Sequence, residues 1–169
     1  MHKDLPVRKN IRLQGYDYSN CGAYFITICV KDRQEILGEI VGQGLCSCRL
    51  SSIGKIIDIE IVQLAMRYPQ IEILKYVIMP NHVHLLLAIV ETRQEQSPCP
   101  TKPSIGDVIC ALKSITTKKA NQHDRMKGRK IWQFRYYDHI IRDEPEYQRI
   151  WQYIDENPQR WPDDCYYTK

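Results

Sequence analysis

Residues 76–88 read YVIMPNHVHLLLA, an apolar stretch interrupted by a polar segment that contains two histidines. The strand-like runs 71–79 and 82–90 are joined by the two-residue turn signal Pro-Asn, a pattern that predicts an antiparallel β-hairpin. Because side chains alternate along a strand, His82 and His84 are expected on one face and the intervening apolar residues on the other. Two imidazoles are therefore predicted on one face of a strand in the core.

Working outward from this hairpin, the predicted order is strand, helix, hairpin, helix and then a terminal helix. This order indicates an α+β sandwich, with helices on one face of an antiparallel sheet. The final helix has the clearest signals, because Asp143 and Glu146 form a capping-box pattern with Pro145 in the first turn. The predicted elements are a strand at 23–30, a strand pair or loop at 39–50, a helix from 53 to about 67 capped by Ser51 or Ser52, a loop at 91–103, a helix capped by Ser104, a basic loop at 121–130, an aromatic-rich strand at 131–137 and a helix from 143 to about 156.

Length and composition restrict the class of protein. At 169 residues, the chain is expected to form one domain over residues 1–169. Its longest apolar stretch is far shorter than the roughly 20 residues that span a bilayer, and the basic N-terminus precedes no apolar signal region. The seven irregularly spaced cysteines are interpreted as reduced thiols. These features predict a cytoplasmic protein without a membrane segment.

The net charge of +4 is unevenly distributed, and acidic residues gather in the C-terminal third. Such asymmetry suggests that a polyanion approaches one side of the protein, although a solvated basic surface explains the same pattern. The cations selected as candidate phosphate contacts are Arg8, Lys9, Arg12, Lys113, Lys118, Lys119, Arg125, Lys127, Arg129 and Lys130.

The two histidines allow two interpretations. Imidazoles two residues apart on a strand face can chelate a metal ion, and they can equally be hydrogen-bonded residues at the edge of a core. In the terminal helix, an apolar stripe must pack on the body of the protein. Tyr153 lies off that stripe and shares a flank of the helix with Asn157. The stripe consists of Tyr147, Ile150, Trp151 and Ile154.

Three segments in order, YVIMPNHVHLLL, WQFRYYDHIIRDE and YIDENP, resemble the single-tyrosine HUH transposases. The REP-associated tyrosine transposases are the more similar branch, and NIRLQGYDYSNCGAYFITICVKDR and NPQRWPDD extend the likeness over nearly the whole chain. The resemblance implies a ferredoxin-like or RRM-like antiparallel sheet with the histidine pair on a central strand. It also implies that the C-terminal helix carries the reactive tyrosine.

Carried over to this chain, the resemblance implies that His82 and His84 bind a metal and that Tyr153 attacks DNA. Asn157 corresponds to the position of a third ligand, but it precedes Pro158 and could instead end the helix. His139 is the alternative third ligand. Two imidazoles and an amide oxygen suit Mn²⁺ better than Mg²⁺, whereas cellular abundance favours Mg²⁺.

The implied function is metal-dependent cleavage and rejoining of single-stranded DNA beside a hairpin, through a 5′-phosphotyrosine intermediate. The expected protein is a monomer or a homodimer. Trp132, Tyr136 and Tyr137 could stack on bases, or pack in the core instead. The rival hypotheses are a metal-dependent phosphoesterase that uses water and a non-catalytic DNA-binding module derived from a transposase.

Overall fold

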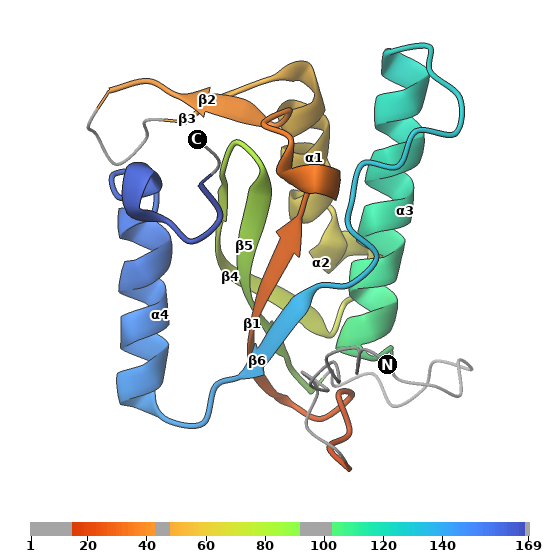
Figure 1. Ribbon diagram of the computed structural model, residues 1–169. Coiled ribbons are helices and arrows are strands. Elements are labelled where there is room, and N and C mark those ends of the chain that lie inside the picture. Colours follow the sequence, from red (N-terminus) through yellow and green to blue (C-terminus); the bar gives the residue numbers. More distant parts are fainter. Residues whose placement is uncertain (1–14, 43–47, 92–102, 168–169) are drawn as a thin grey trace, which may run out of the picture.

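The computed structural model describes residues 15–42, 48–91 and 103–167. Its main sheet is antiparallel, with the strand order β4-β5-β1-β6 (Figure 1). Two βαβ units interlock in it, because β5 separates β1 from β4 and β1 separates β5 from β6, as in ferredoxin-like folds. The predicted fold class is therefore confirmed. The strands are β1 (Gly22–Cys29), β4 (Ile71–Ile78), β5 (His82–Ile89) and β6 (Tyr137–Ile140).

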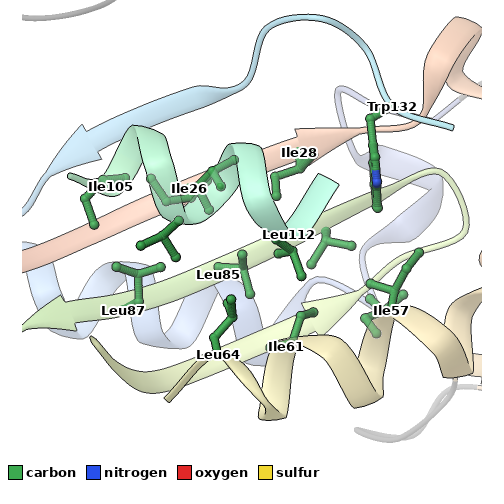
Figure 2. Packing of buried hydrophobic residues seen from close by; sticks show 14 of the residues in the cluster. Ile26, Ile28, Ile57, Ile61, Leu64, Leu85, Leu87, Ile105, Leu112 and Trp132 are labelled. Carbon is green, nitrogen blue, oxygen red and sulfur yellow. The ribbon is translucent and has the colours of Figure 1, made fainter. Parts of the chain in front are cut away.

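One face of this sheet carries the main hydrophobic core. It is covered by α1 (Ser52–Val62), α2 (Leu64–Arg67) and α3 (Ile105–His123). Figure 2 shows how the aliphatic side chains of β1 and β5 meet those of the three helices. The sheet contributes Ile26, Ile28, Leu85 and Leu87, and the helices contribute Ile57, Ile61, Leu64, Ile105 and Leu112.

The opposite face is covered by α4 (Glu144–Glu156), which lies on the other side of the sheet from α1 and α3 in Figure 1. Its apolar stripe packs over β4 and β5, where Ile154 joins Phe25 and Leu86 in a smaller cluster. The predicted stripe is confirmed, since Tyr147, Ile150 and Trp151 pack against the same cluster.

Most predicted boundaries are confirmed with small shifts. The hairpin turns at Pro80-Asn81, and Ser51 and Ser104 cap their helices. The strand pair at 39–50 is β2 (Gly38–Ile40) with β3 (Cys48–Leu50). The loop predicted at 91–103 lies mostly outside the described residues. Two short 3₁₀ turns, η1 (Lys31–Arg33) and η2 (Trp161–Asp163), are the remaining elements among the described residues.

Four details of the prediction are wrong. The helix at 53–67 is broken at Gln63, whose ψ of −8° interrupts the regular turn. The basic loop begins three residues later than expected, because α3 continues to His123. The strand at 131–137 is reduced to a bridge between Val30 and Trp132, and pairing resumes only in β6. At α4, the Glu146 carboxylate accepts from the backbone N–H of Arg142 instead of completing the box with Asp143.

The five described cysteines are free thiols, while Cys46 and Cys99 lie outside the described residues. Within the same ranges, every helix is too short or too polar to cross a membrane. The prediction of a single domain over residues 1–169 stays a prediction.

Candidate metal and tyrosine site

His82 and His84 open β5 and point to the α4 face of the sheet, as the alternation of the strand predicts. Both imidazoles are buried, with 0% and 1% of their surface exposed. The two Nε2 atoms face each other at 3.0 Å. Two ligands at right angles, each about 2.1 Å from an octahedral cation, would be about 3.0 Å apart. The spacing of the pair is thus suited to binding one ion.

Asn81, the last residue of the hairpin turn, orients the first imidazole. Its Nδ2 donates to the backbone carbonyls of Tyr166 (2.8 Å) and Arg33 (3.3 Å). The amide oxygen is therefore left to accept from His82 Nδ1, which lies 2.9 Å away. This bond places the ring proton on Nδ1 and leaves the Nε2 lone pair free for a metal ion.

The protonation of the pair also suits a metal ligand. Burial lowers the pKa of His82 to about 4, although the nearby Asp164 carboxylate opposes the shift. Burial and the neighbouring His82 hold the pKa of His84 well below its usual value of 6.5. Thr27 Oγ1 lies 2.8 Å from His84 Nδ1 and fixes that ring. Both imidazoles are neutral at pH 7, which is the form that binds metals.

Tyr153 projects from α4 toward the histidines. Its hydroxyl lies 3.2 Å from His84 Nε2, and its ring packs edge-on against Phe25. Burial, followed by the negative charge of Asp164, raises the pKa of Tyr153 above its usual value of 10. The phenol is 39% exposed and borders a cavity of about 470 Å³. The Tyr153 side chain is therefore open to solvent at this cavity.

Asn157 lies one turn beyond Tyr153 and is 2% exposed. Its Nδ2 donates to Asp164 Oδ2 at 2.8 Å, and its Oδ1 has no hydrogen-bond partner within the described part of the chain. A buried amide oxygen without a partner is unfavourable unless a cation or water satisfies it. Asn157 also follows the last residue of α4, so the helix-ending role and the ligand role are compatible.

Asp164 was not predicted as a site residue. The chain turns back after α4 through η2 and returns to the β4–β5 hairpin (Figure 1). The ligand atoms of His82, His84 and Asp164 lie within 4.8 Å of one another. The Tyr166 ring covers His82 with a centroid separation of 4.5 Å. The only sequence signal is the acidic pair that ends NPQRWPDD, and a pair of acids so near a terminus is common on surfaces.

These residues fit a divalent cation. Two neutral imidazoles, a carboxylate and a buried amide oxygen without a hydrogen-bond partner converge from β5, α4 and the segment after α4. Nitrogen and oxygen donors of this kind match Mn²⁺, and they also accept Mg²⁺. His139 does not join them, because its Nε2 contacts Glu146 Oε1 at 2.7 Å.

The predicted cations fall into two groups. Three have structural partners: Lys113 donates to the carbonyls of Gln133 and Phe134, Lys119 pairs with Glu60, and Arg129 pairs with Asp124. Four others are exposed and form no ion pair within residues 15–42, 48–91 and 103–167: Lys118, Arg125, Lys127 and Lys130. Arg8, Lys9 and Arg12 lie outside the described residues.

The aromatic residues that were predicted to stack on bases also fall into two groups, buried and exposed. Trp132 is buried and donates from Nε1 to Thr116 Oγ1 at 2.9 Å, so it belongs to the core. Tyr136 packs against the same core. Tyr137 is 41% exposed and lies on the α4 face, where its ring contacts Phe25 edge-on. Phe134, which was not singled out, is 96% exposed.

Comparison with known proteins identifies relatives of this chain. An uncharacterized protein of Haemophilus influenzae is 34% identical over 95% of this chain and 93% of its own length. A candidate REP-associated tyrosine transposase from the same organism is 26% identical over 84% of this chain and 73% of its own.

A solved structure of a REP-associated tyrosine transposase bound to a REP hairpin has the same fold. Its TM-score is 0.54 at 20% identity, and the match covers 87% of this chain and 70% of that one. Residues 18–157, which include the histidine pair, Tyr153 and Asn157, match the family model described as "Transposase IS200 like". The chain therefore belongs to the IS200-like transposase family.

Proposed function

We propose that this transposase cleaves and rejoins single-stranded DNA beside a hairpin, through a covalent bond between Tyr153 and a 5′-phosphate. The observation that carries the proposal is the 3.2 Å approach of the Tyr153 hydroxyl to His84 Nε2, beside a pair of neutral imidazoles. A nucleophile next to a metal-binding group is the arrangement that phosphoryl transfer requires.

The proposed step conserves the energy of the phosphodiester. A new bond forms between the Tyr153 oxygen and phosphorus, and the bond between phosphorus and the 3′-oxygen breaks. The phenol loses its proton and the departing 3′-oxygen gains one, so a free 3′-OH remains for the reverse reaction. The packing of Tyr153 against Phe25 holds the phenol in place before the attack.

His82, His84 and the Oδ1 of Asn157 would hold the divalent cation, with Mg²⁺ or Mn²⁺ as the candidates. When bound, the cation supplies positive charge at a non-bridging phosphate oxygen. Partial burial, followed by the nearby Asp164 carboxylate, raises the pKa of Tyr153, so a bound cation would favour loss of the phenol proton during the attack.

The DNA contacts are proposed for exposed groups. Lys118, Arg125, Lys127 and Lys130, with Arg8, Lys9 and Arg12 from the N-terminal segment, would contact phosphates. Lys113, Lys119 and Arg129 were also predicted there, but their protein partners favour a structural role. Tyr137 is the best placed to stack on a base, because it is exposed on the face that carries the histidines.

One chain is proposed to suffice for cleavage. Tyr153 approaches the histidines of its own chain, and α4 packs on its own sheet through Ile154 and Trp151. A homodimer is the alternative. Sedimentation of the protein–DNA adduct measures which of the two is active.

The decisive experiment mixes the protein with labelled single-stranded DNA that carries candidate hairpins, in the presence of Mn²⁺. Denaturing gels should show a covalent adduct that disappears in Tyr153→Phe and in His82→Ala. Tyr147→Phe is the matched control, because Tyr147 lies on the packing stripe of the same helix and should leave the adduct unchanged. Cleavage that persists in Tyr153→Phe would support the water-dependent phosphoesterase, and binding without cleavage would support the non-catalytic module.

A further inference from the structure

The segment after α4 is anchored over the histidine pair by contacts with distant parts of the chain. Arg33 donates from a guanidinium N–H to the backbone carbonyl of Cys165 at 2.9 Å, and its guanidinium lies 5.4 Å from the centre of the Tyr166 ring. Asn81 donates to the Tyr166 carbonyl while it also orients His82. The hairpin turn that orients the first imidazole therefore also anchors this segment.

The turn that carries Arg33 has an unfavourable backbone conformation, which indicates that its contacts with the segment after α4 are important. Asp32 and Arg33 both have positive φ angles, 55° and 53°. Non-glycine residues rarely adopt this conformation, and two in succession carry a cost that the surrounding contacts must offset. The Arg33 carbonyl accepts from Asn81, and its side chain contacts the returning segment. The strained turn thus joins the hairpin to residues 165 and 166.

What the anchor brings to the site is the Asp164 carboxylate. Oδ2 accepts from Asn157 and Oδ1 accepts from the Tyr166 backbone N–H at 2.7 Å, so the group is held from both sides. Each oxygen keeps a second lone pair. Asp164 forms no ion pair in the described ranges, and its carboxylate lies within 4.8 Å of the ligand nitrogens of His82 and His84. A partly buried carboxylate without a cationic partner is unfavourable, and a bound metal ion would supply the positive charge that offsets this cost.

We propose that Asp164 is an anionic ligand of the metal centre, contributed by the segment after α4 in addition to His82, His84 and Asn157. This inference rests on the proposed function, because it concerns the same ion. A carboxylate changes the donor set from neutral to negatively charged. A ligand set that includes a carboxylate binds a divalent cation more tightly than two imidazoles and an amide do.

The proposal is tested by metal affinity, which does not depend on cleavage. Isothermal titration with Mn²⁺, in the absence of DNA, should show binding to the wild type that weakens about 10- to 100-fold in Asp164→Asn. Asp163→Asn is the matched control, because it removes the same charge from the neighbouring, exposed position and should leave the affinity within about twofold. Equal losses in the two variants would overturn the proposal, because they would reflect net charge alone.

A double-mutant cycle separates a ligand from a group that only orients Asn157. If Asp164 binds the ion, Asp164→Asn should still weaken Mn²⁺ binding in an Asn157→Ala background. If Asp164 acts only through its bond to Asn157, the second substitution should have no effect there, and the proposal is wrong. Circular dichroism and thermal melts of each apo variant identify any that fail to fold.

Failure of this inference can be distinguished from failure of the proposed function. A wild type that does not bind Mn²⁺, or whose binding survives His82→Ala and His84→Ala, contradicts the metal site itself. A wild type that binds through the histidines but is indifferent to Asp164→Asn contradicts only the role of Asp164. The electron paramagnetic resonance spectrum of bound Mn²⁺ should change in Asp164→Asn and remain that of the wild type in Asp163→Asn.

Discussion

The two faces of the main sheet are built from the same strands but contain different kinds of groups. On β5, Val83, Leu85 and Leu87 point into the large core under α1 and α3, while His82 and His84 point to the α4 face. The first face buries a large cluster of apolar side chains, most of them aliphatic (Figure 2). On the second face, a small apolar cluster lies beside a polar one.

This difference shows how a fold can keep unfavourable groups in place. Buried imidazoles and an amide oxygen that lacks a hydrogen bond cost free energy, and the aliphatic face stabilises the sheet enough to tolerate them. The apolar cluster on the α4 face positions the helix: Phe25 and Ile154 pack so that Tyr153 reaches His84. We therefore expect substitutions on the first face to affect folding most and substitutions on the second to affect chemistry most.

The largest effect should come from neighbouring residues of β5. Leu85→Ala removes a fully buried side chain from the large core and should lower the free energy of unfolding by about 2–5 kcal/mol. His84→Ala loses the bond to Thr27 and should cost only about 1 kcal/mol while it abolishes the DNA adduct. Urea unfolding of both variants measures the contrast. A larger stability loss in His84→Ala would contradict the division between the faces.

Glu60 is the exception on the helical side, because it is a fully buried carboxylate between Arg67 and Lys119. Burial would raise the pKa of Glu60, but hydrogen bonds and ion pairs with Lys119 and Arg67 hold it below its usual value of 4.5. Its contribution is therefore present above pH 4.5 and is lost as the pH falls through the lowered pKa.

We expect Glu60→Gln to be less stable than the wild type by about 1–3 kcal/mol at pH 7, with the gap narrowing below pH 4. Urea midpoints at a series of pH values measure it. Glu39→Gln is the control, since Glu39 pairs with Arg49 on the exposed surface. A gap that widens in acid would mean that Glu60 is not held charged by its partners.

Lys75 tests whether the position of α4 matters for chemistry. It lies on β4, and its ammonium pairs with Asp155 and lies 4.2 Å from the centre of the Trp151 ring. Lys75→Met should weaken the docking of α4 by about 1 kcal/mol, slow adduct formation and speed hydrogen exchange in this helix. Lys31→Met should change neither, because Lys31 pairs only weakly with Asp32 on the surface.

The smallest effect on stability, and a clear one on binding, is expected at Lys118 of α3. Lys118→Gln should keep unfolding within about 0.5 kcal/mol and reduce the salt dependence of single-strand DNA binding by about 0.7 in log–log slope. Lys119→Gln should instead lower stability, because Lys119 pairs with the buried Glu60. Fluorescence anisotropy at several salt concentrations measures these slopes. If Lys118→Gln had the same slope as the wild type, Lys118 would not contact DNA phosphates.

The sequence predicted what depends on short-range rules. The β4–β5 hairpin follows from two strand-like runs around Pro-Asn, and the α4 boundary follows from Asp143 and Pro145. Alternation along β5 was enough to place His82 and His84 together. The break at Gln63 and the loss of the strand at 131–136 were missed because tertiary contacts override weak local preferences. The roles of His82, His84, Tyr153, Asn157 and the cations stay proposals.

By itself, the sequence determined the antiparallel sheet, the histidine pair and the off-stripe position of Tyr153, because strand and helix periods are local properties of the chain. The tertiary structure decided which groups meet. Tyr153 reaches His84 only because α4 packs over β4 and β5, and Asp164 joins the site only because the chain returns after α4. Such contacts join residues about 70 to 80 positions apart in the sequence, and no local sequence pattern predicts them.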